Sequence, residues 1–469
     1  MPEDLTWLPA WRLRELAVEK DISPVEVTDH FLNRIEEIDP KLFSFATVDA
    51  SGAREQAKAA ERKVLANEPV GVLHGVPVAV KETIGVKGLP APAAGIASFP
   101  HDYIAVERLR NAGAVILGTT AMTSRADRRE QLAGSRSSLG GMPVEFHTDS
   151  DVVGTPANPW DLSRDPGPSS RGSGAAVAAG LTPVAIGTDG AGSVRLPAAL
   201  CGIVGMHVSR GLVPVVDYPW PTLSLLLSTG PLTRSVRDSA IVTQVLAGPD
   251  GRDIACSPFA APDYLEHIDD GIAGLRIGWT DDFGFSRTYM SDETRRVVAT
   301  AREAAFSLKD LGAAVTGTDT SWDDPLPAYD AMAATFHPFT LIGSLPGPER
   351  RPSPAEYQAG AELRGRVWHQ TRRFFEEHDL LVSATCTMVA PSPEELAAPW
   401  STEMVYRYTG HTAMFNLLGF PAMSVPCGFV DDLPVGLQIV GRPGDEALVF
   451  RAGQAFQQAN PRDERPPVG

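Results

Sequence analysis

Residues 166–202 read PGPSSRGSGAAVAAGLTPVAIGTDGAGSVRLPAALCG, and this stretch decides both the fold and the chemistry that the chain can support. Two glycine-rich turns that carry serines, 165–174 and 188–193, overlap this stretch, and the apolar residues 183–187 between them predict a strand. Such turns leave backbone N–H groups unpaired beside an exposed serine. A serine in this setting can attack a carbonyl and have the resulting oxyanion bound. Structural turns without catalytic serines are the open alternative.

Familiar catalytic and nucleotide-binding motifs do not fit this stretch. No lysine follows the glycines as in G-x-x-x-x-G-K-[ST], and G-x-G-x-x-G lacks its strand–loop–helix with a downstream acidic residue. G-x-S-x-G is absent around Ser193, which excludes the α/β-hydrolase elbow. The ten histidines are scattered, and none has a convincing aspartate context. A classical Ser–His–Asp hydrolase is therefore not predicted.

A lysine is the candidate base instead. Lys81 ends the apolar run 76–80, VPVAV, which predicts a strand that delivers the amine to a low-dielectric site. To be neutral near pH 7, this lysine must lose about three pKa units, at a cost of roughly 4 kcal/mol that burial can supply. A solvated lysine is the alternative. Pro77 places this strand at a sheet edge, or else begins it.

Helical and strand patterns alternate along the chain, which predicts an α/β architecture. Ser23, Pro24 and Glu26 predict a capped helix start. The other predicted helices cover residues 52–67, 106–112, 294–311, 355–378 and 446–458. The predicted strands cover residues 76–80, 114–118, 183–187, 275–278, 380–383, 421–425 and 437–440.

The amino-acid composition of the chain limits which partners and which cellular compartment are expected. The chain has 469 residues and a formal net charge of −17, which argues against nucleic acid or an anionic membrane as a partner. Four separated cysteines predict free thiols rather than a zinc site or disulfides. With no leader peptide or membrane-spanning run in the sequence, these features predict a cytoplasmic protein. The length allows two or three cores or one large unit.

Five segments resemble the amidase signature family, in that family's order. They are residues 75–88, 158–180, 187–205, 415–429 and 433–447. The resemblance implies an α/β amidase-signature fold, in which a large mixed central β-sheet is covered by helices on both faces. It also implies a single domain over residues 1–469. Within this domain we expect a helical region 1–70, a catalytic core 71–235, a variable substrate-facing region 236–404 and the rest of the core, 405–469.

The family's catalytic residues fall on serines and a lysine already singled out. The resemblance implies Lys81 as base, Ser169 as a bridging serine after a cis peptide, and Ser193 as nucleophile. It implies an oxyanion hole made by the amides of Gly190, Ala191, Gly192 and Ser193. It also implies Ser170 as a second serine holding the lysine, Asp189 and Arg195 as structural partners, and no metal or cofactor.

The chain departs from the family pattern at several positions. Pro168, Arg171 and Ala191 stand where glycine is usual, and His207-Val208-Ser209 replaces Lys-Pro-Thr. The triad is unaffected, but substrate choice is left open. Candidate pocket residues are Tyr218, Trp220, Phe336 and Phe339. The polar stretch 125–157 is expected to be either a lid over the site or a surface excursion.

The resemblance implies hydrolysis of a C–N acyl bond in a small amide, anilide or carbamate (urethane) through an acyl-enzyme. A cyclic or oligomeric amide is an alternative substrate. The glutaminase subunit of a tRNA-dependent amidotransferase is a further alternative, although residues 218–235 lack that subunit's Ser-Ser-Leu-Asp-Gln run. A non-catalytic binding protein with the same fold is the alternative from another class. A homodimer is left open.

Overall fold

The structure is a computed structural model that describes residues 4–92, 96–122, 155–215, 225–336, 352–392, 394–395 and 401–468. Within these ranges, eleven strands form one sheet. They are β1 (Phe45–Val48), β2 (Pro77–Lys81), β3 (Val115–Thr120), β4 (Val184–Asp189), β5 (Val204–His207), β6 (Ser228–Thr233), β7 (Arg276–Trp279), β8 (Ala314–Gly317), β9 (Leu380–Ala384), β10 (Ala422–Val430) and β11 (Leu433–Val440). In space the order is β1-β3-β2-β4-β6-β5-β10-β11-β9-β7-β8.

The sheet is mixed. Strands β3, β2 and β4 run parallel to one another, and β6, β5, β10, β11 and β9 continue with antiparallel pairings. Pro77 is the first residue of β2, which lies between β3 and β4. The expectation that Pro77 begins its strand is confirmed, and the edge alternative is wrong. A proline at the first position needs no ladder N–H, so the strand can lie inside the sheet.

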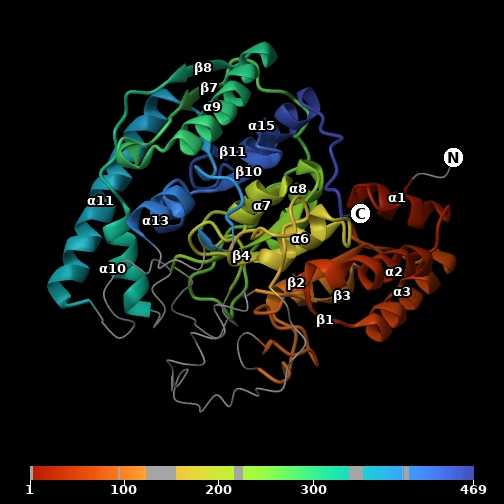
Figure 1. Ribbon diagram of the computed structural model, residues 1–469. Helices are drawn as coiled ribbons and strands as arrows, with labels where there is room; N and C mark the ends of the chain where they lie inside the picture. The colour runs from red at the N-terminus through yellow and green to blue at the C-terminus, as the bar shows by residue number, and fades with distance from the viewer. Residues whose placement is uncertain are drawn as a thin grey trace.

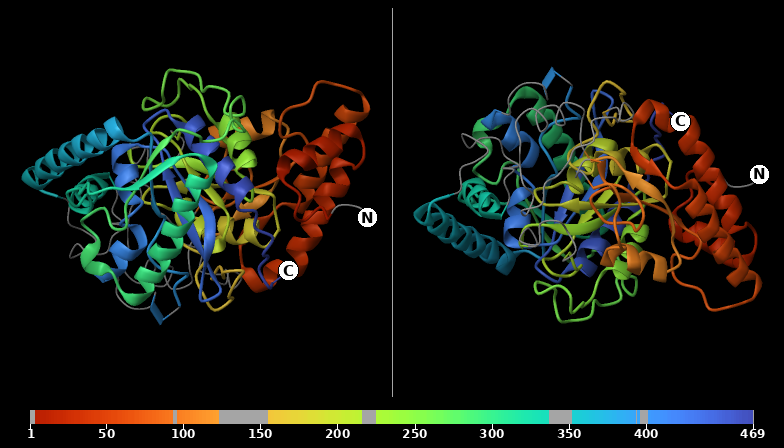
Figure 2. Two further views of the ribbon diagram at one scale, coloured as in Figure 1. Left: turned by 90° about the horizontal axis from the view of Figure 1, so that it is seen from above. Right: turned by 90° about the horizontal axis from the view of Figure 1, so that it is seen from below.

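Helices cover both faces of this sheet (Figure 1). Those in the described ranges include α1 (Ala10–Glu19), α2 (Pro24–Leu42), α3 (Ala50–Leu65), α4 (Ile104–Asn111), α6 (Arg171–Ala178), α7 (Arg195–Cys201), α8 (Val236–Leu246), α9 (Asp292–Ser307), α10 (Leu326–Phe336), α11 (Pro354–Glu377), α13 (Thr402–Thr409), α14 (Ala413–Leu418) and α15 (Glu446–Ala459). Helices α1, α2 and α3 lie at one end of the molecule and α11 at the other in every view (Figures 1 and 2).

Strand alternation divides the core between the two faces. Val78, Val80 and Ile186 belong to one buried cluster that includes residues of α4, α8, α9 and α15. Ala79 and Ala185, which alternate with them, belong to a second cluster with residues of α2, α3, α6 and α7. The predicted α/β fold, a large mixed sheet covered on both faces, is therefore confirmed.

Local sequence signals account for where several elements begin. The backbone N–H of Ser23 donates to Glu26 Oε2 at 2.8 Å, and the Ser23 side chain caps α2, which starts at Pro24. This is the capping box predicted from the sequence. Three cysteines are buried and Cys256 is half-buried, and all four are free thiols, as expected. No helix in the described ranges is long and apolar enough to cross a membrane.

Candidate active site

The candidate site lies where β2 and β4 end. Lys81 is the last residue of β2 and Asp189 the last of β4, and the two strands are parallel neighbours. Their side chains therefore emerge at the same edge of the sheet. The glycine-rich turn 190–194 leads from β4 into α7, and the turn that precedes α6 brings Ser169 to the same edge.

The Lys81 amine is buried between two hydroxyl groups. Its Nζ donates to Ser169 Oγ at 2.6 Å and to Thr188 Oγ1 at 2.9 Å, and the side chain is 1% exposed. Burial lowers the pKa of Lys81 to about 7, although the negative charges of Glu82 and Asp189 oppose this shift. A substantial fraction of this amine is thus neutral near pH 7 and able to accept a proton.

The two serines of the first turn have different environments. Ser169 follows a cis peptide bond to Pro168, as expected, and is half-buried. Ser170 is fully buried, and its Oγ donates to the backbone oxygen of Thr188 at 3.3 Å. The expectation that Ser170 holds the lysine is therefore corrected, because the second hydroxyl on the amine belongs to Thr188. The Ser170 hydroxyl is directed to the Thr188 carbonyl and holds the end of β4.

Asp189 and Arg195 form a buried ion pair beneath the second turn. Arg195 Nη2 lies 2.9 Å from Asp189 Oδ1, and both side chains are 0% exposed. Burial alone would raise the pKa of Asp189, but Arg195 and the hydrogen bonds from Arg195 and Asn416 hold it well below its usual range. The carboxylate also accepts hydrogen bonds from the amides of Gly192 and Val194. It therefore organises the turn that carries Ser193.

The amide of Gly192 is already occupied. It donates to Asp189 Oδ1 at 2.7 Å. Of the four amides expected to bind an oxyanion, this one is therefore bonded to the protein instead. Gly192 has φ of +122°, and a Cβ there would lie 2.4 Å from Thr412 Oγ1. Only glycine fits this position, because both the backbone angle and the close neighbour exclude a side chain.

Arg171, which stands where the family has glycine, has a partner in the structure. Its Nε lies 2.7 Å from Asp165 Oδ2, and both side chains are buried. The amide of Gly167 donates to the other oxygen of Asp165 at 2.7 Å. The pair therefore braces the turn that carries Ser169 from both ends. Sequence reasoning missed Asp165, because only the folded turn brings it back onto Arg171.

With this geometry in place, comparison with known proteins assigns the chain to a family. A family model described as Amidase matches residues 26–333 and 344–450. The chain belongs to the amidase signature family. It is 33% identical to a glutamyl-tRNA(Gln) amidotransferase subunit of Roseiflexus castenholzii, over 97% of this chain and 96% of that protein. It is 30% identical to an acylamidase of Rhodococcus erythropolis, over 99% of this chain and 98% of that protein.

A solved structure agrees with this membership. A bacterial aryl acylamidase of the amidase signature family superposes with a TM-score of 0.80 at 27% identity, covering 98% of each chain. The chain is thus an enzyme of an amide-hydrolysing family, which confirms the resemblance drawn from its motifs.

Most of the expected substrate pocket falls outside the described part of this amidase. Tyr218, Trp220 and Phe339 lie outside it, as does the side chain of Phe336, the last residue of α10. Nearly all of the stretch 125–157, the expected lid or surface excursion, also lies outside. Among the described residues, no group of three or more His, Cys, Asp or Glu could hold a metal ion.

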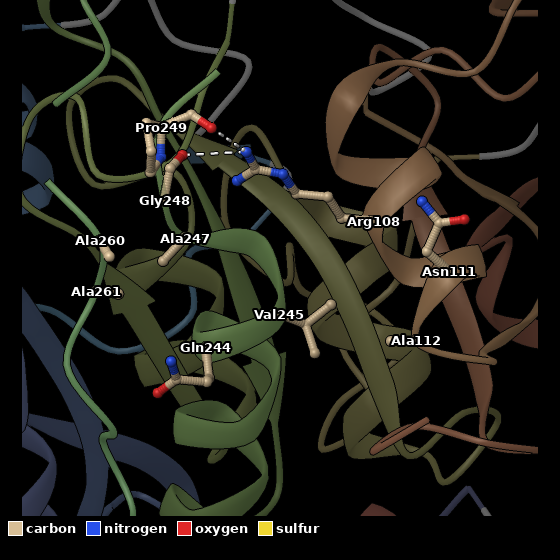
Figure 3. A pocket seen from close by; sticks show the side chains of 10 residues that line it. All are labelled: Arg108, Asn111, Ala112, Gln244, Val245, Ala247, Gly248, Pro249, Ala260 and Ala261. Atoms are coloured by element: carbon tan, nitrogen blue, oxygen red, sulfur yellow. Dashed lines mark hydrogen bonds between the residues drawn. The ribbon is translucent and has the colours of Figure 1, made fainter. Parts of the chain in front are cut away.

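A surface pocket of about 510 Å³ lies elsewhere in the amidase, over α4 and α8 (Figure 3). Arg108 on its wall donates to the carbonyls of Gly248 and Pro249 at 3.1 Å each. The remaining lining residues are Asn111, Ala112, Gln244, Val245, Ala247, Ala260 and Ala261. None of the candidate site residues lines this pocket, so it is distinct from the site at the ends of β2 and β4.

Proposed function

We propose that this amidase signature enzyme hydrolyses a C–N acyl bond of small amides and anilides, with Ser193 as nucleophile, Ser169 as proton relay and Lys81 as base. One observation carries the proposal: the buried Lys81 amine lies 2.6 Å from Ser169 Oγ, and burial lowers its pKa to about 7. A second contact supports it, because the amide of Ser170 donates to the backbone oxygen of Ser193 at 3.3 Å. The two serine-bearing turns are thereby joined.

The mechanism follows from these contacts. Neutral Lys81 accepts the proton of Ser169, which accepts the proton of Ser193 as the Ser193 oxygen attacks the substrate carbonyl. The oxyanion is stabilised by turn amides, for which Gly190, Ala191 and Ser193 are the donors because Gly192 is occupied. The same relay returns the proton to the leaving amine, and the acyl-enzyme remains. Water, deprotonated through the relay, then hydrolyses the ester.

The test uses the purified chain with p-nitroacetanilide as substrate. Ser193→Ala is expected to abolish hydrolysis while leaving the unfolding midpoint unchanged, because a covalent nucleophile is worth several orders of magnitude in kcat. Ser163→Ala is the matched control, since Ser163 is an exposed serine whose hydroxyl donates to Asp161. Retention of more than about 1% of the kcat by Ser193→Ala would remove Ser193 as the nucleophile.

A second candidate is the glutaminase subunit of an amidotransferase, favoured by the identity to the Roseiflexus castenholzii protein. The stand-alone enzyme is the better proposal, because His207-Val208-Ser209 replaces Lys-Pro-Thr and residues 218–235 lack the Ser-Ser-Leu-Asp-Gln run. A hydrolysis panel of glutamine, aliphatic amides, anilides, carbamates and cyclic amides separates these activities. Turnover of glutamine alone, and only in the presence of partner subunits, would favour the amidotransferase role.

We also propose that residues 1–469 act as one domain in which region 236–404 faces the substrate. The continuous sheet from β1 to β8 supports the first part. The second part is supported by α10, which contacts the turn of Ser193 through Tyr329.

A further inference from the structure

Tyr329 of α10 reaches the candidate oxyanion turn with its hydroxyl group. The Tyr329 hydroxyl donates to the backbone oxygen of Gly190 at 2.7 Å, and the side chain is 1% exposed. Burial raises the pKa of Tyr329 well above its usual range, so the phenol keeps the proton that it donates. The residue lies in region 236–404, outside every segment by which the sequence resembles its family.

The carbonyl groups of this turn are all held by the protein. Gly190 O accepts from Tyr329, Ala191 O accepts from Thr412 Oγ1 at 2.6 Å, and Gly192 O accepts from the amide of Leu196 at 2.6 Å. In a trans peptide the C=O and the following N–H point in opposite directions. The one cis peptide in the described ranges precedes Ser169, so the peptides of this turn are trans.

The hydrogen bonds to these carbonyl groups fix the direction in which each amide N–H of the turn points. The peptide between Ala191 and Gly192 has both polar groups tied to protein, since its N–H donates to Asp189. The peptides on either side are held by their carbonyls, so the N–H groups of Ala191 and Ser193 point away from those contacts. The hydroxyl of Tyr329 fixes the orientation of the first of these, the peptide between Gly190 and Ala191.

Ala191, the residue of the turn that departs from the family pattern, packs in the same buried cluster as Tyr329. Ala191 stands where the family has glycine, and its methyl group joins a buried cluster with Tyr329, Ala413 and Leu417. The Gly190–Ala191 peptide is therefore restrained twice, by a hydrogen bond to its oxygen and by the packing of the side chain that follows it.

We propose that Tyr329 is a positioning residue for the oxyanion hole, whose hydroxyl fixes the Gly190–Ala191 peptide so that the Ala191 N–H is directed at the substrate carbonyl oxygen. This inference rests on the proposed function, because it requires an oxyanion to form at Ser193. Tyr329 does not touch the reacting atoms and acts through the peptide that it holds. Losing a donor from an oxyanion hole typically costs about 100- to 1000-fold in kcat, and misdirecting one is expected to cost less.

The test compares Tyr329→Phe with Tyr264→Phe. Tyr264 is equally buried, packs against Phe450, and its hydroxyl has no hydrogen-bond partner within the described ranges. For Tyr329→Phe, kcat on p-nitroacetanilide is expected to fall about 10- to 100-fold with KM within about 2-fold. Tyr264→Phe is expected to leave kcat within about 2-fold.

A trifluoromethyl ketone that forms a tetrahedral adduct with Ser193 supplies a readout that a merely structural role would not move. Its inhibition constant is expected to weaken in Tyr329→Phe by the same factor as kcat, because the adduct carries the oxyanion. An unchanged kcat in Tyr329→Phe, or a lower kcat with an unchanged inhibition constant, would overturn the positioning role. In that case Ser193-dependent turnover by the parent enzyme would still uphold the proposed function. Absence of Ser193-dependent turnover in the parent enzyme would overturn both.

Discussion

Replacing Lys81 by methionine tests the electrostatics of the site without relying on catalysis. In the folded protein the pKa of this lysine is about 7, compared with 10.5 for an ordinary lysine. The difference corresponds to about 5 kcal/mol by which the fold disfavours the ammonium form. Methionine has a similar length and no charge, so the Lys81→Met variant lacks this penalty at every pH.

The sign of the effect follows from the two pKa values. Below pH 7 the lysine is charged in both the folded and the unfolded chain, so the folded state carries the full penalty. Between about pH 7 and pH 10.5 the unfolded chain binds one more proton than the folded protein, so the free energy of unfolding rises with pH. The slope approaches about 1.4 kcal/mol per pH unit, or about 2 kcal/mol between pH 7 and pH 9.

The assay is urea unfolding of the parent enzyme and of Lys81→Met at half-unit steps from pH 6 to pH 9. Other titrating groups are common to both proteins, so the difference between the two curves isolates Lys81. The parent enzyme is expected to gain about 2 kcal/mol relative to the variant across the upper two pH units. Parallel curves, or a gain toward low pH, would refute the assignment of a lowered pKa to Lys81. Loss of the hydrogen bonds to Ser169 and Thr188 offsets the curves without changing this slope.

Two further predictions concern Lys81 as the proposed base and the ion pair beneath the turn of Ser193. Because a protonated Lys81 cannot accept a proton, kcat/KM on p-nitroacetanilide is expected to fall tenfold per pH unit below about pH 7, and a flat profile from about pH 5 to pH 9 would contradict a lysine base. Arg195→Met is expected to lower the free energy of unfolding by about 3–5 kcal/mol, because it leaves the carboxylate of Asp189 buried and unpaired. The control is Arg296→Met, which removes an exposed ion pair with Asp431 and is expected to lower the free energy of unfolding by less than about 1 kcal/mol in urea unfolding. Equal losses of unfolding free energy in the two variants would show that the buried ion pair stabilises the fold no more than the exposed one.

Local signals in the sequence predicted several elements of the fold, including the strand that carries Lys81. The capping box at Ser23 marked the start of α2, and the apolar run ending at Lys81 marked β2. Both signals act over a few residues, where capping and strand alternation leave a direct trace in the sequence. Proline at position 77 allowed two interpretations, and only the neighbours of β2 in the sheet decided between them.

Contacts between distant segments could not be predicted in the same way. Thr188 and Tyr329 lie 107 and 139 residues away from Lys81 and Gly190, their respective partners. Thr188 stands at the start of the predicted turn 188–193, but nothing in that pattern marks it as a partner of the lysine, and in the structure it belongs to β4. Tyr329 stands in no pattern that distinguishes it from a core tyrosine. Helix α10, which carries Tyr329, was not predicted at all, because its residues are apolar on most sides and show no clear helical stripe. Thr188 gains its role only from the contact with Lys81, and Tyr329 only from the contact with Gly190, both of which the folded chain creates.

The order of strands in the sheet has a consequence for how the enzyme is made. Strands β10 and β11 come last in chain order among the described strands, yet in space they lie between β5 and β9. While a ribosome is still short of residue 440, β5 can pair only with β6 and β9 only with β7, so each strand keeps one edge that lacks its partner. Exposed edges of this kind invite pairing with other chains, and long-range strand pairing is slow. Growing chains of this amidase are therefore expected to depend on chaperones until the hairpin has been synthesised.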